Sequence, residues 1–372
     1  MIARNHEISQ YLRTSFLILA IFGLSSCAPV QERANNEKPR VLIYPPPPDE
    51  PRYAYERTIY GSADVTPRKA DAALKRTLTG ERETSEGLAK PYAVKVHRGR
   101  IFVSDSADRF VKVFDVAEGR YFKIGDDELG PLTKPLGLDV DMAGNLYVTD
   151  ATAKAVLVYT RDGKFLRKIG SSKVFERLSS VTVDTVGQRL FVTDIGGVAS
   201  DQHKIKVFDL NTGAHQFDLG KRGIGPGEFN LPRDVAIGAN GQIYVVDGGN
   251  FRVQVFDRGG KFINSFGSVG KQLGNFARPK EVATDPSGNV YVVDAAFGNF
   301  QIFSPDGDLL MFIGERSERD GPARYMLPSG IDVDEDGRVY MVDQWFKKID
   351  IFRPAALPED AGFLAKRPAT MK

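Results

Sequence analysis

The chain has 372 residues, of which 42% are hydrophobic and 26% are charged. This composition is typical of a globular protein with a substantial core, and it excludes both a disordered chain and a membrane protein with several spans. The 50 Lys and Arg residues are balanced by 48 Asp and Glu residues. The resulting net charge of +2 excludes the broad basic surface that nucleic-acid binding needs, so we expect no nucleic-acid partner.

Residues 1–26 have the pattern of a bacterial signal peptide. Arg4 and Arg13 precede an apolar run over residues 16–24, which is too short to span a bilayer as a stable helix. The LSSC tetrapeptide that follows closely resembles a lipobox, in which the cysteine becomes the acylated first residue of the mature protein. Cys27 is the only cysteine of the chain, which excludes an intramolecular disulfide. The alternative is an ordinary signal peptide with Cys27 as a buried thiol.

Residues 27–53 are expected to form a spacer between the lipid anchor and the folded body. The residue after the cysteine is Ala28 and not Asp. In this respect the chain resembles lipoproteins that are sorted to the outer membrane. We therefore expect an outer-membrane lipoprotein in the bacterial cell envelope that faces the periplasm and contacts the membrane through its N-terminal lipid. Consecutive prolines over residues 45–48 favour a semi-rigid polyproline II segment. A Pro-rich recognition ligand is the alternative interpretation.

One pattern recurs at intervals of 44 to 53 residues from there to residue 353. Apolar segments of the type IYVVD end at Asp105, Asp150, Asp194, Asp247, Asp294 and Asp343. Each is preceded by a strand that usually opens with proline and followed by two more strands, with Gly- or Asn-containing turns between them. Four antiparallel strands per repeat at this spacing predict an all-β fold, a six-bladed β-propeller over residues 54–353. Residues 354–372 remain as a C-terminal tail.

The sixth repeat ends at Phe352 without a fourth strand. Residues 55–61 have the pattern of that strand but stand before the first complete repeat. We therefore expect this N-terminal strand to close the ring and cover an otherwise open sheet edge. The apolar rhythm over residues 68–78 predicts a short helix that caps one end.

The connectors KRGIGPGEFNLP and VGKQLGNFARP and the segment VVDGGNFRVQVFD resemble NHL repeats. The resemblance covers roughly residues 55–353 and is strongest over residues 220–303. It implies a six-bladed NHL-type propeller. The connectors of the second and third repeats depart from the pattern, so the resemblance implies the fold rather than a shared ligand.

The aspartates that end the repeated segments could form a metal ring, but the turn after each one favours a structural role. A short carboxylate at this position can accept hydrogen bonds from turn N–H groups. We interpret these six residues as turn caps.

The first strand of each repeat should lie nearest the propeller axis, where its alternate side chains line a channel. The polar residues expected there are Lys95, Asp139, Asp234, Glu281 and Asp332. Such an acidic cluster could hold Ca²⁺ through carboxylate oxygens. The interpretation we favour is a hydrated lining whose carboxyl pKa values are raised, with no cofactor.

Some six-bladed relatives are enzymes, namely calcium-dependent lactonases and an amidating lyase with histidine-bound zinc. In this chain His97 falls in a hairpin turn, while His203 and His215 belong to one repeat, so a three-histidine zinc site is not expected. No serine-hydrolase elbow is present. A metal-dependent lactonase or lyase acting at the axis therefore remains an alternative that rests on analogy.

The turns between second and third strands gather aromatic and basic residues on one face. This candidate binding face comprises Arg109, Phe110, Arg233, Arg252, Lys280, Phe297, Trp345 and Phe346, with Phe251 and Phe300 nearby. Aromatic side chains combined with arginines are typical of protein and glycan contacts. The sequence therefore favours a binding or scaffolding module for an envelope protein or polysaccharide over an enzyme.

Overall fold

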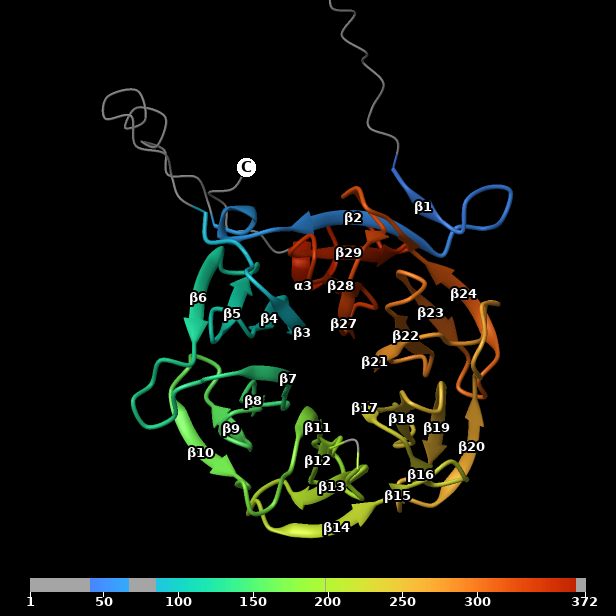
Figure 1. Cartoon of the computed structure of the whole chain (residues 1–372). Coiled ribbons are helices and arrows are strands. Elements are labelled where there is room, and N and C mark those ends of the chain that lie inside the picture. Colours follow the sequence, from blue (N-terminus) through green and yellow to red (C-terminus); the bar gives the residue numbers. More distant parts are fainter. Residues whose placement is uncertain (1–40, 67–84, 198, 366–372) are drawn as a thin grey trace, which may run out of the picture. The chain divides into compact units, whose positions relative to one another are not determined.

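Each repeated segment ending in Asp forms the second strand of a four-stranded antiparallel sheet. The computed structural model describes residues 41–66, 85–197 and 199–365, and the sheets within them are arranged as six blades around an axis (Figure 1). Strands β3, β7, β11, β17, β21 and β27 are innermost in their blades and surround that axis. The prediction of a six-bladed β-propeller is confirmed.

Strand bounds follow the sequence pattern closely. Blade 1 contains β3 (Pro91–His97), β4 (Arg100–Asp105), β5 (Phe110–Asp115) and β6 (Arg120–Ile124); blade 2 contains β7 (Pro135–Val140), β8 (Leu146–Asp150), β9 (Ala155–Tyr159) and β10 (Phe165–Ile169). Blade 3 contains β11 (Leu178–Asp184), β12 (Arg189–Asp194), β13 (Lys204–Asp209) and β14 (His215–Leu219). Blade 4 contains β17 (Pro232–Ile237), β18 (Ile243–Asp247), β19 (Arg252–Phe256) and β20 (Phe262–Phe266). Blade 5 contains β21 (Pro279–Thr284), β22 (Val290–Asp294), β23 (Asn299–Phe303) and β24 (Leu309–Ile313).

Blade 6 combines the two ends of the repeat region. Its strands are β27 (Pro328–Val333), β28 (Val339–Asp343), β29 (Lys348–Pro354) and the N-terminal β2 (Tyr53–Ile59). Strand β2 pairs antiparallel with β29, from Tyr53 opposite Pro354 to Ile59 opposite Ile349 (Figure 1). The predicted closure of the ring is confirmed, and the strand begins two residues earlier than the sequence pattern indicates.

The structure differs from the expected spacer at its end. Strand β1 (Ile43–Tyr44) pairs with β2 as a fifth strand of blade 6, and the Tyr44 ring contacts Phe352 with the centroids 5.7 Å apart. Ile43, Tyr44 and Tyr53, which the sequence pattern places in the spacer, therefore belong to strands of blade 6, and aromatic packing holds Tyr44 there. Cys27 and the helix expected over residues 68–78 lie outside the described residues.

The remaining elements are short. Two-stranded parallel pairs form between β15 (Lys221–Arg222) and β16 (Glu228–Phe229), and between β25 (Glu315–Arg316) and β26 (Arg324–Tyr325). The helices are the 3₁₀ turn η1 (Ser62–Asp64) and α3 (Gly362–Ala365). Within the described ranges, no helix is long and apolar enough to cross a membrane.

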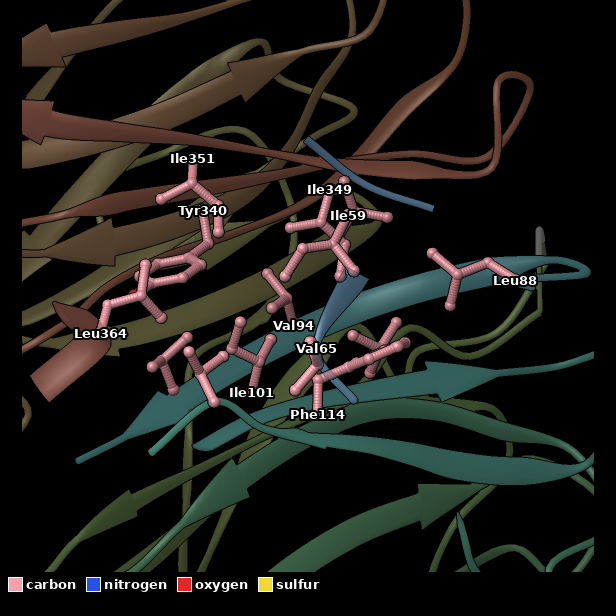
Figure 2. Packing of buried hydrophobic residues seen from close by; sticks show 14 residues of the cluster. Ile59, Val65, Leu88, Val94, Ile101, Phe114, Tyr340, Ile349, Ile351 and Leu364 are labelled. Atoms are coloured by element: carbon pink, nitrogen blue, oxygen red, sulfur yellow. The ribbon is translucent and has the colours of Figure 1, made fainter. Parts of the chain in front are cut away.

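The core consists of apolar clusters between neighbouring blades. Figure 2 shows the cluster between blades 6 and 1, where Ile59 of β2 and Ile349 of β29 face Val94 and Ile101 of blade 1. Leu364 of α3 is fully buried in the same cluster. Leu364 of the predicted C-terminal tail is therefore part of the core, and the N-terminal strand closes the ring with apolar contacts as well as with hydrogen bonds.

Candidate functional site

A β-bulge shapes the start of every innermost strand. In each blade the pairing between first and second strands shifts register just after the opening residue, for example between Pro232 and Val235 in blade 4. A bulge re-aims the side chains of the extra residues. In blades 4 and 5 those residues are Arg233 with Asp234, and Lys280 with Glu281. The bulge thus brings a basic and an acidic side chain to the axis from each of these blades.

The five polar residues predicted for the channel line one cavity of about 120 Å³ on the axis, here called the axial cavity. They are Lys95, Asp139, Asp234, Glu281 and Asp332. The Lys95 ammonium lies 3.3 Å from an oxygen of Asp139 and 3.1 Å from an oxygen of Asp332. Burial opposes its charge, but these two carboxylates raise the pKa of Lys95, so it stays protonated.

The acidic residues are bonded to backbone across blade boundaries. Asp332 accepts the Val96 N–H at 2.7 Å, and Asp139 accepts the Val183 N–H at 2.7 Å. Asp234 accepts the Val282 N–H at 2.9 Å, and Glu281 accepts the Ile331 N–H at 3.2 Å. Each donor belongs to the innermost strand of the next blade, whose inner edge has no strand partner. The carboxylates therefore satisfy edge N–H groups and join neighbouring blades.

The two remaining boundaries use other side chains. Lys95 links blade 1 to Asp139 of blade 2. Between blades 3 and 4, the Ser180 hydroxyl donates to Asp234 and the Thr182 hydroxyl donates to the Val235 carbonyl. Polar contacts at the axis thus connect all six blades into a ring.

Burial changes the titration of these groups. It raises the pKa of Asp234 and of Asp332 from 3.8 to about 6, although Ser180 and Lys95, respectively, oppose the shift. Burial, with the nearby Asp234 charge, also raises the pKa of Glu281 well above 4.5. Raised carboxyl pKa values match the interpretation of the axis as a structural lining.

In the part of the chain that the structure describes, no three His, Cys, Asp or Glu side chains converge as a metal would require.

The histidines have separate local roles. His97 contacts Glu335 at 3.1 Å, and His215 contacts Asp218 at 2.8 Å. His203 is buried, and its Nδ1 accepts the Leu231 N–H at 3.2 Å. These three side chains do not form a common site.

The repeated aspartates cap the turns that surround them, as the sequence indicates. Asp294 is fully buried; its Oδ2 accepts the N–H groups of Ala277 and Arg278, and its Oδ1 accepts those of Ala296 and Phe297. The distances lie between 2.7 and 3.1 Å. Asp343 makes the equivalent four bonds in blade 6. These carboxylates hold the connector against the turn between the second and third strands.

We call the side of the propeller that carries these turns the loop face. Trp345 is 62% exposed there, and Arg109 is also exposed. Phe110, Phe297 and Phe346 are half-buried in the same turns of blades 1, 5 and 6. Arg233 and Lys280 lie apart from them, at the entrance to the axis, where they line a second cavity with Glu281.

Two residues expected on this face make contacts inside the propeller. The Arg252 guanidinium is engaged within its own blade, because Nε donates to Asp247 at 2.9 Å and Nη2 donates to the Gly225 carbonyl at 2.8 Å. Phe300 is fully buried between blades 5 and 6, with its ring 5.8 Å from that of Phe352. Phe251 is half-buried against the cluster between blades 4 and 5. Sequence reasoning also missed Arg278 and Ser329, which share the cavity of Arg233 and flank the prolines that open β21 and β27.

The geometry defines a six-bladed β-propeller with a bonded axis and an aromatic loop face. Residues 229–256 match the family model of the NHL repeat. The chain is 25% identical to mouse NHL repeat-containing protein 3 over 45% of its length and 51% of the relative's. It is 31% identical to a probable peptidyl-alpha-hydroxyglycine alpha-amidating lyase of Caenorhabditis elegans over 30% of its length and 31% of the relative's. The chain thus spans about half, or less, of these curated relatives.

Solved propellers resemble this fold at low sequence identity. A gluconolactonase from Xanthomonas campestris has a TM-score of 0.55 at 15% identity, and 81% of this chain and 98% of that one are covered. For a catalytically inactive virginiamycin B lyase from Staphylococcus aureus the TM-score is 0.52 at 14% identity, with 73% and 84% covered. A Bacteroides thetaiotaomicron protein of unknown function has a TM-score of 0.59 at 15% identity, with 80% and 75% covered. At such identities the likeness shows the fold alone.

Proposed function

We propose that this chain is a binding or scaffolding module that docks an envelope protein or polysaccharide on the loop face of its propeller. The observation that carries the proposal is the exposure of Trp345 beside the half-buried Phe346. The Trp345 indole N–H donates to no group among the described residues. A large aromatic side chain with a free donor is typical of the centre of an interface.

The axis supports the same proposal because its contacts weaken the enzyme alternative. Its carboxylates accept backbone N–H groups of neighbouring blades, so they already have structural partners. A lactonase or lyase site at the axis would need some of those oxygens for a metal. The enzyme hypothesis is therefore the weaker one.

Site-specific photocrosslinking tests the docking face. A photoreactive amino acid would replace Trp345 in one variant and Met142 in the control; Met142 is 70% exposed in a turn between first and second strands, on the opposite face. We expect a discrete crosslinked product in cells from position 345 and none from position 142. Equal products from both positions, or products from position 142 alone, would refute docking on the loop face.

We also propose that Cys27 anchors the protein to the bacterial envelope as a lipoprotein, facing the periplasm from the outer membrane. The LSSC tetrapeptide supports this proposal. Several acyl chains on one residue would give stable membrane attachment. The Cys27→Ser variant should move the protein from the membrane fraction to the soluble fraction. A variant that stays with the membrane would show that another feature attaches it.

A further inference from the structure

The entrance to the axis on the loop face is a small cavity with an unusual concentration of positive charge. We call it the mouth pocket; its volume is about 70 Å³, which suits one chemical group rather than a whole ligand. Its lining comes from blades 1, 3, 4, 5 and 6 and comprises Tyr92, Ser180, Arg233, Arg278, Pro279, Lys280, Glu281 and Ser329. Three of these side chains are cationic.

The cations of the mouth pocket lack acidic partners. Among the residues that the structure describes, no carboxylate lies within ion-pair distance of Arg233, Arg278 or Lys280. The Lys280 ammonium donates to the Pro328 carbonyl at 3.0 Å, which leaves its other protons free. Arg177, which precedes the innermost strand of blade 3, adds a further positive charge close to Arg233.

The charge on these groups is costly while the pocket is empty. Burial lowers the pKa of Arg233, and the charges of Arg177 and Arg278 lower it further. Burial likewise lowers the pKa of Lys280 to about 8, with Arg278 contributing in the same direction. A bound anion would offset both the desolvation and the mutual repulsion of these cations.

A neutral donor in the same cavity is also unsatisfied. Ser329 is 2% exposed, and its hydroxyl has no hydrogen-bond partner. In blade 3 the equivalent Ser179 donates to the Arg233 carbonyl at 3.1 Å, so a free hydroxyl at this position is not a property of the repeat. A buried hydroxyl without a partner destabilises the folded state because it has lost its hydrogen bonds to water. This donor marks the place where an acceptor would bind.

Glu281 offsets the positive charge only in part: its charge, like that of Asp343, opposes the lowering of the Lys280 pKa, but burial dominates. It is the one acidic residue in the lining, and its Oε2 accepts the Ile331 N–H. Burial raises the pKa of Glu281 well above 4.5, which favours its neutral form and weakens any repulsion of a ligand. Tyr92, whose pKa burial raises to about 12, is neutral as well.

We propose that the mouth pocket binds an oxyanion group, a carboxylate or a phosphate or sulfate ester, of a ligand that approaches from the loop face. Arg233 and Arg278 supply planar guanidinium donors, Lys280 supplies an ammonium, and Ser329 supplies a hydroxyl. This inference rests on the proposed function and deepens it, because it names the chemical group that the docked partner presents beside the aromatic turns.

Binding is tested with inorganic sulfate and with acetate, which separate a tetrahedral from a planar oxyanion. The thermal midpoint of the full chain is measured against anion concentration, with chloride keeping the ionic strength constant. We expect saturable stabilisation beyond that of chloride by at least one of the two probes. Arg233→Met and Lys280→Met should each weaken it about tenfold, as expected for loss of one charge-assisted hydrogen bond. Lys347→Met, which removes an exposed cation from the turn between β28 and β29 on the same face, should leave it unchanged.

Ser329→Ala distinguishes ligand binding from a structural role. Because the hydroxyl has no partner in the empty pocket, its removal should leave the thermal midpoint without anion unchanged or raise it. The same variant should bind sulfate or acetate more weakly. A lower midpoint without anion, together with unaltered anion binding, would show that Ser329 is merely structural and would contradict the proposal.

The pH dependence provides a second readout. Sulfate keeps its charge between pH 7 and pH 9, so its affinity should fall as Lys280 loses its proton above a pKa of about 8. Deprotonation of Glu281 would act in the same direction, whereas the guanidinium groups and Tyr92 do not titrate in this range. Lys280→Arg should keep binding and flatten the profile, and Glu281→Gln should leave the fall in place.

If neither sulfate nor acetate stabilises the wild-type chain more than chloride does, the mouth pocket is not an oxyanion site. Crosslinking from position 345 would still stand in that case, so docking on the loop face would survive the loss of this inference. Anion binding without crosslinking would instead support the pocket and refute the aromatic face.

Discussion

Asp234 is the axial residue whose titration reports most directly on the ring. Its folded-state pKa of about 6 exceeds the ordinary 3.8, so the native state binds the proton more tightly than the unfolded chain does. The stability from this group is therefore fully present below pH 4 and is lost as the pH rises through 6. One pKa unit corresponds to about 1.4 kcal/mol, so the loss is on the order of 3 kcal/mol.

Asp234→Asn should remove that pH dependence, because the amide mimics the neutral carboxyl. The variant should gain stability relative to wild type between pH 4 and pH 7 and keep that gain above pH 7. Thermal melting across this range measures the difference, with the exposed Asp308→Asn as the control. A difference that does not change with pH would show that Asp234 is not desolvated at the axis.

Asp294 illustrates the opposite requirement, since all four of its contacts need an acceptor oxygen. In the Asn variant one side-chain oxygen remains and can keep two of the four bonds. The amide NH2 group, which replaces the other oxygen, would face the remaining two backbone N–H donors. We expect Asp294→Asn to lower the free energy of unfolding by about 3 kcal/mol. Urea denaturation measures it, and a loss within experimental error would contradict the role of the repeated aspartates as turn caps.

The closing strand is the element on which the blade 6 sheet depends. Ile59 is fully buried between blades 6 and 1, whereas Ile43 in β1 is only half-buried at the outer edge of the same sheet. Ile59→Ala should therefore lower the free energy of unfolding by about 2–5 kcal/mol, and Ile43→Ala by clearly less. Chemical denaturation of both variants provides the comparison. Equal losses would show that β2 contributes no more to closure than β1 does.

Much of this element-level structure could be predicted because its signals are local. Opening prolines, Gly- and Asn-containing turns and the missing fourth strand of the last repeat together predicted the blades and the role of β2. Strand β1 and helix α3 could not be predicted in this way. Strand β1 has only two residues and depends on the contact of Tyr44 with Phe352. Helix α3 is a single turn and depends on the contact of Leu364 with the cluster between blades 6 and 1.

The site was predictable only in part for a similar reason. Strand alternation places Asp139 and Asp332 at the axis, but their N–H partners belong to other blades and become visible only in the assembled ring. Arg252 was assigned to the binding face because its turn is there, yet a buried carboxylate of its own blade holds it. The mouth pocket combines residues from several repeats, so no single segment of sequence indicates it.

At the scale of the whole molecule, the axial cavity and its entrance on the loop face differ in chemistry. The axial cavity is acidic and bonded to backbone, while its entrance on the loop face is basic and has unpaired donors. The exposed aromatic side chain of Trp345 is on that same face. We propose that the axis provides stability and the loop face provides recognition, and this proposal separates a binding module from a propeller enzyme.

Metal analysis of the purified full chain tests this claim most directly. Elemental mass spectrometry of wild type and Asp234→Asn, each equilibrated with Ca²⁺ and Zn²⁺ and then desalted, measures the bound metal per chain. We predict far less than one ion per chain in both proteins, because each of the four axial carboxylates already accepts a backbone N–H of the next blade. One ion per wild-type chain that is lost in Asp234→Asn would contradict the structural role of the axis and favour the metal-dependent enzyme.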